Sequence, residues 1–255
     1  FNSLLNTIHD TTEADLVIAP ARGTTFPVEE LPRGVVESVE GVAASSYYLE
    51  ESVMAEYDGR QMPATLRGVD EHYTQVVPLA DSGMVWYGGW QLVHGERRKA
   101  VVGFDLDNLF ADGYSVRKAA LHGKLSVHAL RRENISSLLP ISAIRTVEVG
   151  HAGTLSDAAT ELTGHLFVSL DVAEELLSAK GRASAVAIRL SSGAKMARVQ
   201  KELQGAVGEG FVVENRYQRN EVYDEYGAIV KELAAKYGLI CVDLQAGWDK
   251  LFEHM

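Results

Sequence analysis

The chain has 255 residues and a formal net charge of −11 at pH 7. Its hydrophobic fraction of 46% and its charged fraction of 23% are those of a globular protein, with enough apolar material for one large domain or two small ones. The acidic balance argues against a nucleic-acid-binding surface or a polybasic membrane anchor, since the longest basic cluster is Arg97-Arg98-Lys99. The longest apolar runs fall well short of the roughly 20 residues that cross a bilayer.

The N-terminal part of the chain alternates between helical and strand patterns. Apolar residues three or four positions apart predict helices, and runs of β-branched and aromatic residues predict strands. In chain order we expect a helix at 1–10, a strand at 15–20, a short helix at 29–39 that Pro32 and Gly34 interrupt near its start, strands at 43–57 and 62–69, and a short helix or turn at 71–76. Asp58-Gly59, between the last two strands, is a strong signal for a tight hairpin turn.

The central part of the sequence is rich in predicted strands. In chain order we expect an aromatic, glycine-bearing loop at 84–90, a strand at 99–103, a helix at 104–110, strands at 118–121, 124–130 and 144–149, and a strand at 166–168. A helix then begins at Ser169 or Asp171 and ends at Gly181. The pattern continues with a strand at 185–190, an amphipathic helix at 194–207 and a strand at 211–215, which together read as a βαβ-like unit.

No motif with established chemistry is found. The eight histidines form no HxxxH or HxH pattern, and there is no CxxC, P-loop, GxSxG or GxGxxG. Gly208-Glu209-Gly210 lacks a third glycine and reads as a helix end. Cys241 is the single cysteine, and its apolar neighbours predict a buried, inert thiol. We therefore expect no cofactor, no metal ion and no catalytic residue.

The loop at 84–90 is the best candidate for a partner-binding patch. It gathers Trp86, Tyr87 and Trp90 around Gly88-Gly89. Exposed aromatic side chains on a loop bind apolar partners, whereas the same rings turned inward would fill the core. The residues alone leave both interpretations open.

The order of several segments resembles a known family. These segments are ADLVIAPARGTTF at 14–26, VESVEGVAASSYYLEESVMAEYDGRQMPATLRGVD at 36–70, RKAVVGFDLDNLF at 98–110, HLFVSLDVAEELLSAKGRASAVAIRL at 165–190 and VGEGFVVENRYQRNE at 207–221. Together they are similar to the large periplasmic domain of FtsX-like ABC-transporter permeases, of the lipoprotein-releasing LolC/LolE and MacB kinds. Because the chain starts at Phe1 without a signal peptide, we expect it to be a segment of a longer protein.

The resemblance implies an α+β fold with two lobes. A porter-like α/β subdomain would be formed by 1–100 and 184–220, with a β-rich subdomain inserted at 101–183 and an atypical α/β tail, helix–strand–helix, at 221–255. It also implies a non-catalytic role in which the periplasmic domain of an inner-membrane protein passes ATP-driven motion to export or lipoprotein release. The implied partners are the parent transmembrane helices and a cytoplasmic ATPase, with a lipoprotein, a chaperone or a periplasmic adaptor as further partners and with homo- or heterodimers left open.

The tail departs from that family. Where a permease would enter its second transmembrane helix, 221–255 carries charges that are incompatible with a membrane span. This stretch resembles a late fragment of SGNH/GDSL hydrolases, although the block with the catalytic Asp and His is missing. Two alternative functions therefore stay open: an esterase of the SGNH class, and an extracellular binding or adhesion module that uses the aromatic loop.

Overall fold

The structure is a computed structural model, and it describes residues 12–81, 83–110, 124–130, 144–216 and 218. The helix expected at 1–10, the strand expected at 118–121, the tail at 221–255 and Cys241 lie outside these residues. The chain divides into a large unit, Phe1–Glu214, and a small one, Asn215–Met255. The elements of the large unit position every side chain discussed below.

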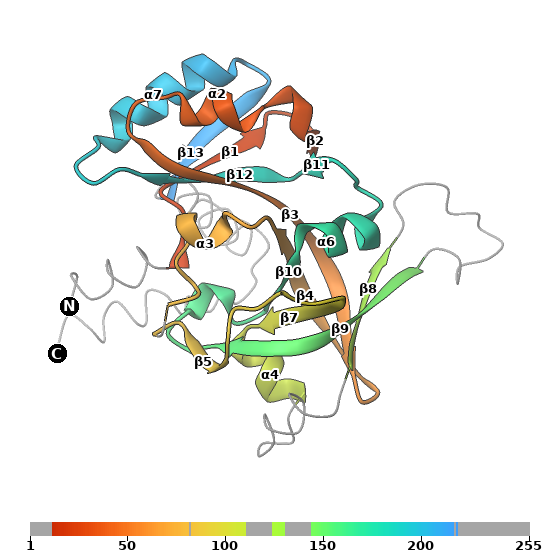
Figure 1. Cartoon of the computed structure of the whole chain (residues 1–255). Coiled ribbons are helices and arrows are strands. Elements are labelled where there is room, and N and C mark those ends of the chain that lie inside the picture. The colour runs from red at the N-terminus through yellow and green to blue at the C-terminus, as the bar shows by residue number, and fades with distance from the viewer. Residues whose placement is uncertain (1–11, 82, 111–123, 131–143, 217, 219–255) are drawn as a thin grey trace, which may run out of the picture. The chain divides into compact units, whose positions relative to one another are not determined.

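The described elements are short helices and many strands (Figure 1). In chain order they are β1 (Leu16–Pro20), β2 (Phe26–Pro27), the 3-10 helix η1 (Val28–Glu30), α2 (Arg33–Glu37), β3 (Val42–Tyr57), β4 (Arg60–Val69), α3 (Tyr73–Val76), β5 (Val85–Gly88), β6 (Val93–His94), β7 (Arg97–Val102), α4 (Phe104–Phe110), β8 (Lys124–Leu130), β9 (Ile144–Leu155), the 3-10 helix η3 (Thr160–Leu162), β10 (His165–Ser169), α6 (Leu170–Leu177), β11 (Arg182–Ala183), β12 (Ala185–Leu190), α7 (Met196–Val207) and β13 (Phe211–Asn215).

Three expectations need correction. The helix expected at 29–39 consists of two short pieces: Pro32 holds an extended backbone that separates η1 from α2, as its position in the sequence indicated, whereas α2 continues through Gly34 and ends at Glu37. The loop expected at 84–90 contains a strand, β5, which pairs with β9. The strand expected at 144–149 continues to Leu155, since its second half finds new partners in β7 and β5.

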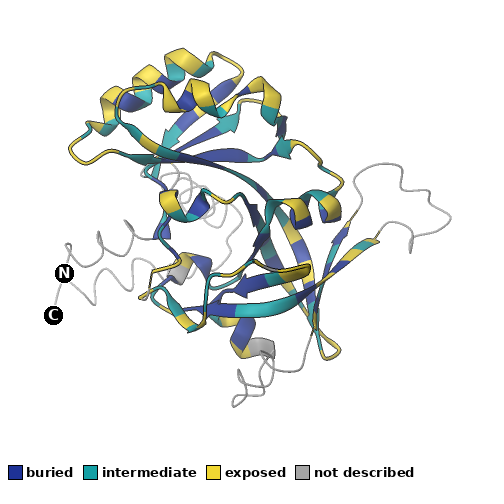
Figure 2. Cartoon of the chain, in the orientation of Figure 1, coloured by how far each residue is buried: buried dark blue, intermediate teal, exposed yellow. Residues whose placement is uncertain are grey.

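The first lobe is a sheet in the order β13-β1-β12-β3, covered by α2 and α7. In chain order its elements run strand, helix, strand, strand, helix, strand, which is the split βαβ arrangement of ferredoxin-like folds. β1 lies between β12 and β13, so the expected βαβ-like unit is interrupted by a third strand. Figure 2 shows α2 and α7 with buried inner faces and exposed outer faces, as amphipathic helices on a sheet require. We call this part the α/β lobe.

The second lobe is a closed ring of strands. β3, β4, β10, β7, β9 and β8 pair in that order, and β8 returns to β3 through Met54–His128, Ala55–Val127 and Glu56–Ser126. Alternate residues of every strand point into the ring and form one apolar cluster, to which α6 also contributes. Closure leaves the ring without a free sheet edge where the strands pair. We call this part the barrel lobe.

β3 belongs to both lobes. Its first half, from Val42 to Tyr48, pairs with β12, and its second half, from Tyr48 to Tyr57, pairs with β4. The expected α+β class, with an α/β part and a β-rich part, is thus confirmed for the described residues. The boundaries at 100, 183 and 220 stay a prediction; within the range 1–100, β4 and β7 pair in the ring. Among the described residues, no helix has the length and apolarity needed to cross a membrane.

A glycine between β7 and α4 permits a close backbone approach. A Cβ on Gly103 would lie 2.1 Å from the carbonyl oxygen of Leu162 and 2.3 Å from that of Thr163. Backbone atoms cannot rotate away, so Gly103→Ala should lower the free energy of unfolding by roughly 1–3 kcal/mol, measured by urea denaturation. Gly34→Ala is the matched control, since an added Cβ there meets nothing within 4 Å. Equal stability of the two variants would contradict the prediction.

Candidate functional site

The junction between the two lobes is built around one carboxylate. Asp70 follows β4 and accepts four hydrogen bonds: at Oδ2 from Arg33 Nη2 at 2.6 Å and Tyr47 N at 3.0 Å, and at Oδ1 from Ser46 Oγ at 2.7 Å and His72 N at 2.9 Å. Donors to all lone-pair directions hold the carboxylate in one position. Asp70 thereby joins α2 and the first half of β3 to the end of β4.

The same group of side chains completes the edge of β3. The pairing of β3 with β4 ends at Tyr48 and Val69. Beyond that point Arg33 Nη1 donates to Ser45 O at 2.8 Å, and Asp70 takes the amide of Tyr47. Side chains thus satisfy backbone groups where the neighbouring strand has turned away.

A partly buried arginine occupies the barrel side of the junction. Arg67 on β4 donates from Nε to Glu50 Oε2 at 2.5 Å and from Nη1 to the Tyr73 hydroxyl at 3.0 Å. Its guanidinium carbon lies 5.1 Å from the ring centroid of Tyr48 and 5.8 Å from that of Phe167. Burial opposes the charged form, but Tyr73 and Glu50 outweigh it and raise the pKa of Arg67. Planar stacking and paired donors are features that arginine provides and lysine does not.

Around Arg67 the aromatic rings form a continuous cluster. Trp90 stacks on Tyr73 with ring centroids 6.3 Å apart and lies 5.2 Å from Phe167. His165 stacks on Phe167 at 5.9 Å, and its Nε2 is 3.5 Å from Arg67 Nη2. Burial and the charge of Arg67 lower the pKa of His165 to about 4, so its ring is neutral at pH 7.

The three predicted partner-binding residues are separated by β5. Trp86 is 59% exposed and meets Phe104 edge-on at 6.0 Å. Trp90 belongs to the cluster around Arg67, and Tyr87 is half-buried and stacks on His151 at 6.2 Å. Trp86 and Tyr87 are successive residues of β5, so their side chains point to opposite faces, whereas Trp90 lies beyond the end of the strand. Of the two interpretations of the loop, Trp86 fits the exposed patch and Trp90 fits the core.

A second arginine ties the segment before β1 to α3. Arg189 on β12 donates from Nη1 to Asp15 Oδ1 and from Nη2 to Glu13 O, both at 3.3 Å, and from Nε to Val76 O at 2.7 Å. Asp15 Oδ2 also accepts from Leu190 N at 2.8 Å. Because α3 carries Tyr73, these contacts connect the segment before β1 to the aromatic cluster. Arg67, Asp70 and Arg189 were not among the candidate residues predicted from the sequence. For Arg189 the signal was a charged residue inside the otherwise apolar strand β12.

A buried polar pair lies beside Tyr87. His151 Nε2 is 3.0 Å from Thr154 Oγ1 and 3.9 Å from Asp107 Oδ1. Burial and the charge of Lys99 lower the pKa of His151 to about 4, whereas burial raises the pKa of Asp107 against the hydrogen bond from Thr154. The ring of His151 is therefore neutral at pH 7. The described residues contain no group of three or more His, Cys, Asp or Glu side chains that could hold a metal ion.

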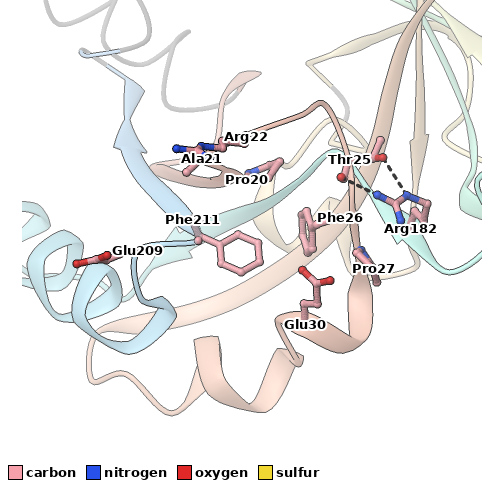
Figure 3. Close-up of a pocket in the computed structure, with 11 residues that line it drawn as sticks. Pro20, Ala21, Arg22, Thr25, Phe26, Pro27, Glu30, Arg182, Glu209 and Phe211 are labelled. Carbon is pink, nitrogen blue, oxygen red and sulfur yellow. Dashed lines mark hydrogen bonds between the residues drawn. The ribbon is translucent and has the colours of Figure 1, made fainter.

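An open pocket of about 540 Å³ lies in the α/β lobe, away from the predicted residues (Figure 3). Its floor is the edge-on pair Phe26 and Phe211, with ring centroids 5.0 Å apart. Arg182 is fixed at one side by hydrogen bonds to Thr25 Oγ1 at 3.0 Å and Thr25 O at 2.8 Å. The lining also carries the charged side chains of Arg22, Glu30 and Glu209.

Solved structures share this fold. One is the extracellular domain of the noncanonic ABC-type transporter YknZ from Gram-positive bacteria. The match covers 79% of this chain and 99% of the YknZ domain, at 16% sequence identity and a TM-score of 0.53. Another is the periplasmic region of MacB from Actinobacillus actinomycetemcomitans. The match covers 87% of this chain and 98% of the MacB region, at 10% sequence identity and a TM-score of 0.54. The expected resemblance is confirmed at the level of the fold.

Comparisons by sequence gave no further relative. No protein-family model matches the chain, and no curated protein matches it. The resemblance of 221–255 to SGNH hydrolases has no support from any comparison.

Loss of the partly buried Arg67 at the junction should lower the stability of the protein. Arg67→Ala leaves Glu50 and the Tyr73 hydroxyl without their partner, so the free energy of unfolding should fall by about 2–4 kcal/mol. Arg67→Lys keeps the charge but not the stacking or the paired donors, and should lose a smaller amount. The control is Arg98→Ala, which breaks the exposed pair Arg98–Glu175 and should cost about 0–1 kcal/mol. Urea denaturation of the three variants checks the order; a loss for Arg67→Ala no larger than for Arg98→Ala would contradict it.

Proposed function

We propose that this chain is the non-catalytic extracytoplasmic domain of an ABC-transporter permease, and that it transmits ATP-driven motion to export or lipoprotein release. The fold that it shares with the YknZ and MacB domains is the observation that carries the proposal. The location would be outside the cytoplasmic membrane, in the periplasm. The partners would be the parent transmembrane helices and a cytoplasmic ATPase, together with a lipoprotein, a chaperone or a periplasmic adaptor.

The internal contacts suit a domain that moves as one body. A displacement of the segment before β1 reaches β12 and α3 through the hydrogen bonds of Arg189. From α3, Tyr73 touches the Arg67 cluster in the barrel lobe. The continuous β3 provides a second connection between the lobes, through backbone hydrogen bonds. Rigid packed elements of this kind pass motion on with little internal deformation.

The first test asks whether the domain moves with ATP. The parent gene should encode apolar segments of roughly 20 residues next to this domain. In the full permease, reconstituted with its ATPase in a Cys241→Ser background, one fluorophore would be placed at Leu130, which is 74% exposed. Energy transfer from this fluorophore to acceptor lipids should change with ATP, and should stay constant with a hydrolysis-deficient ATPase. Within the domain, transfer between labels at Leu130 and Lys201 should stay constant. Energy transfer to the acceptor lipids that does not change with ATP would contradict the proposal.

Arg189 should be required for this coupling. In the same preparation, Arg189→Ala should reduce the ATP-dependent change several-fold while ATP hydrolysis continues. The matched control is Arg198→Ala, whose ion pairs with Glu40 and Glu202 lie on the exposed face of α7. An equal ATP-dependent change in energy transfer for the two variants would show that Arg189 does not couple the segment before β1 to the barrel lobe.

We further propose that Trp86 contacts the transported molecule or a periplasmic partner. Its exposure, next to Phe104, is what supports this role. A photo-activatable phenylalanine analogue at position 86 of the full permease should cross-link a partner in intact cells. The same analogue at position 90 is the control, because Trp90 packs against Phe167. Cross-links from position 90 and none from position 86 would reject the assignment.

A further inference from the structure

The α/β lobe has a sheet edge at β13. An edge strand exposes unpaired N–H and C=O groups with which another chain can pair. β13 has β1 as its neighbour on one side, and no described strand pairs with its other side. Val212 at its centre is 41% exposed. A short apolar edge of this kind invites strand addition by a second copy of the chain.

A glutamine of α7 occupies this edge. Gln204 donates from Nε2 to Phe211 O at 2.8 Å and accepts at Oε1 from Val213 N at 2.9 Å. One side-chain amide therefore provides both the donor and the acceptor with which a neighbouring strand would pair. Gln204 Nε2 also donates to Gly208 O at 3.1 Å, which fixes the amide between the helix end and the strand.

A second glutamine of α7 continues the row. Gln200, one turn earlier, donates from Nε2 to Val213 O at 2.8 Å. Backbone groups of alternate residues point to the same side of a strand, so residues 211 and 213 present theirs to this edge. The carbonyl of Phe211 and both backbone groups of Val213 are therefore hydrogen-bonded to glutamine side chains.

The packing of α7 explains why the amides reach the strand. Val199 and Leu203 are fully buried and pack in one cluster with Phe211 and Val213. Gln200 and Gln204 each follow one of these anchors, one helical turn apart, on the same side of the helix. Val199 and Leu203 hold the helix against the sheet, and the glutamine that follows each of them reaches the edge of β13.

We propose that Gln200 and Gln204 form a glutamine seal that prevents a second copy of this chain from adding its own β13 to the sheet. The seal replaces the missing neighbour strand with side chains that cannot propagate the ladder. This role does not depend on the proposed transport function, because it concerns only the assembly of the domain.

Hydrogen exchange tests the seal in the 255-residue chain itself. The amide of Val213 should be protected although it lies at a sheet edge. Gln204→Ala should lower its protection about tenfold, the effect of one lost hydrogen bond, and leave the amide of Leu49 in β3 unchanged. Free-peptide exchange of Val213 in the unsubstituted chain would overturn the proposal, whether or not any variant folds.

Sedimentation velocity tests the consequence. Gln200→Ala/Gln204→Ala should associate at concentrations at which the unsubstituted chain and the control Lys201→Ala keep their original sedimentation coefficient. Adding Val212→Lys should reverse that association, since a lysine on an edge strand blocks strand pairing. Unchanged sedimentation of the double variant, or association that Val212→Lys does not reverse, would overturn the proposal.

Discussion

The continuity of β3 is the constraint on which the rest of the fold depends. At Tyr48 the strand pairs with Ala185 on one side and with Val69 on the other, so one backbone sets the register of both lobes. Side chains alternate between the two faces of a strand, and a shift of one residue would therefore turn both cores outward together. Neither lobe can slip independently of the other.

The contacts at the junction follow from that constraint. One strand cannot have a full neighbour along its whole length when it passes between two sheets, and some backbone groups are left over. On one side of β3, Asp70 and Arg33 form hydrogen bonds with these backbone groups. On the other side, the Ser184 hydroxyl accepts a hydrogen bond from the amide of Glu50. Charged and polar side chains at these places complete the hydrogen bonding of the backbone, and this explains why they are partly buried.

Local patterns predicted the elements well where the physics is local. Asp58 and Gly59 both adopt positive φ angles, 50° and 74°, as the hairpin signal required. The strands at 124–130 and 211–215 were predicted with the bounds that the structure shows. Order along the chain, however, carries no information about which distant strands pair. The closure of the ring by β8 could not be predicted from the sequence for that reason.

The candidate site shows a similar limit. The sequence marked the aromatic residues of the loop as a group, but Trp86 on β5 is exposed, whereas Trp90, two residues beyond the strand, packs against Tyr73 and Phe167. A strand of four residues among glycines gives too little alternation to be recognised. Arg67 was passed over because a charged residue in a strand usually faces solvent, whereas here aromatic rings and Glu50 make burial favourable.

The split of the α/β lobe in sequence determines the order in which the chain can fold during synthesis. The strands of the ring are all present once β10 ends at Ser169, whereas the α/β lobe must wait for β12, α7 and β13. The carboxylate of Asp15 bonds a backbone amide 175 residues further along the chain. Contacts between residues so far apart in sequence form late and slowly. β1 therefore has no strand partner until β12 and β13 have been synthesised. A chaperone that binds the segment 16–20 during synthesis would therefore act on β1 in its unpaired state.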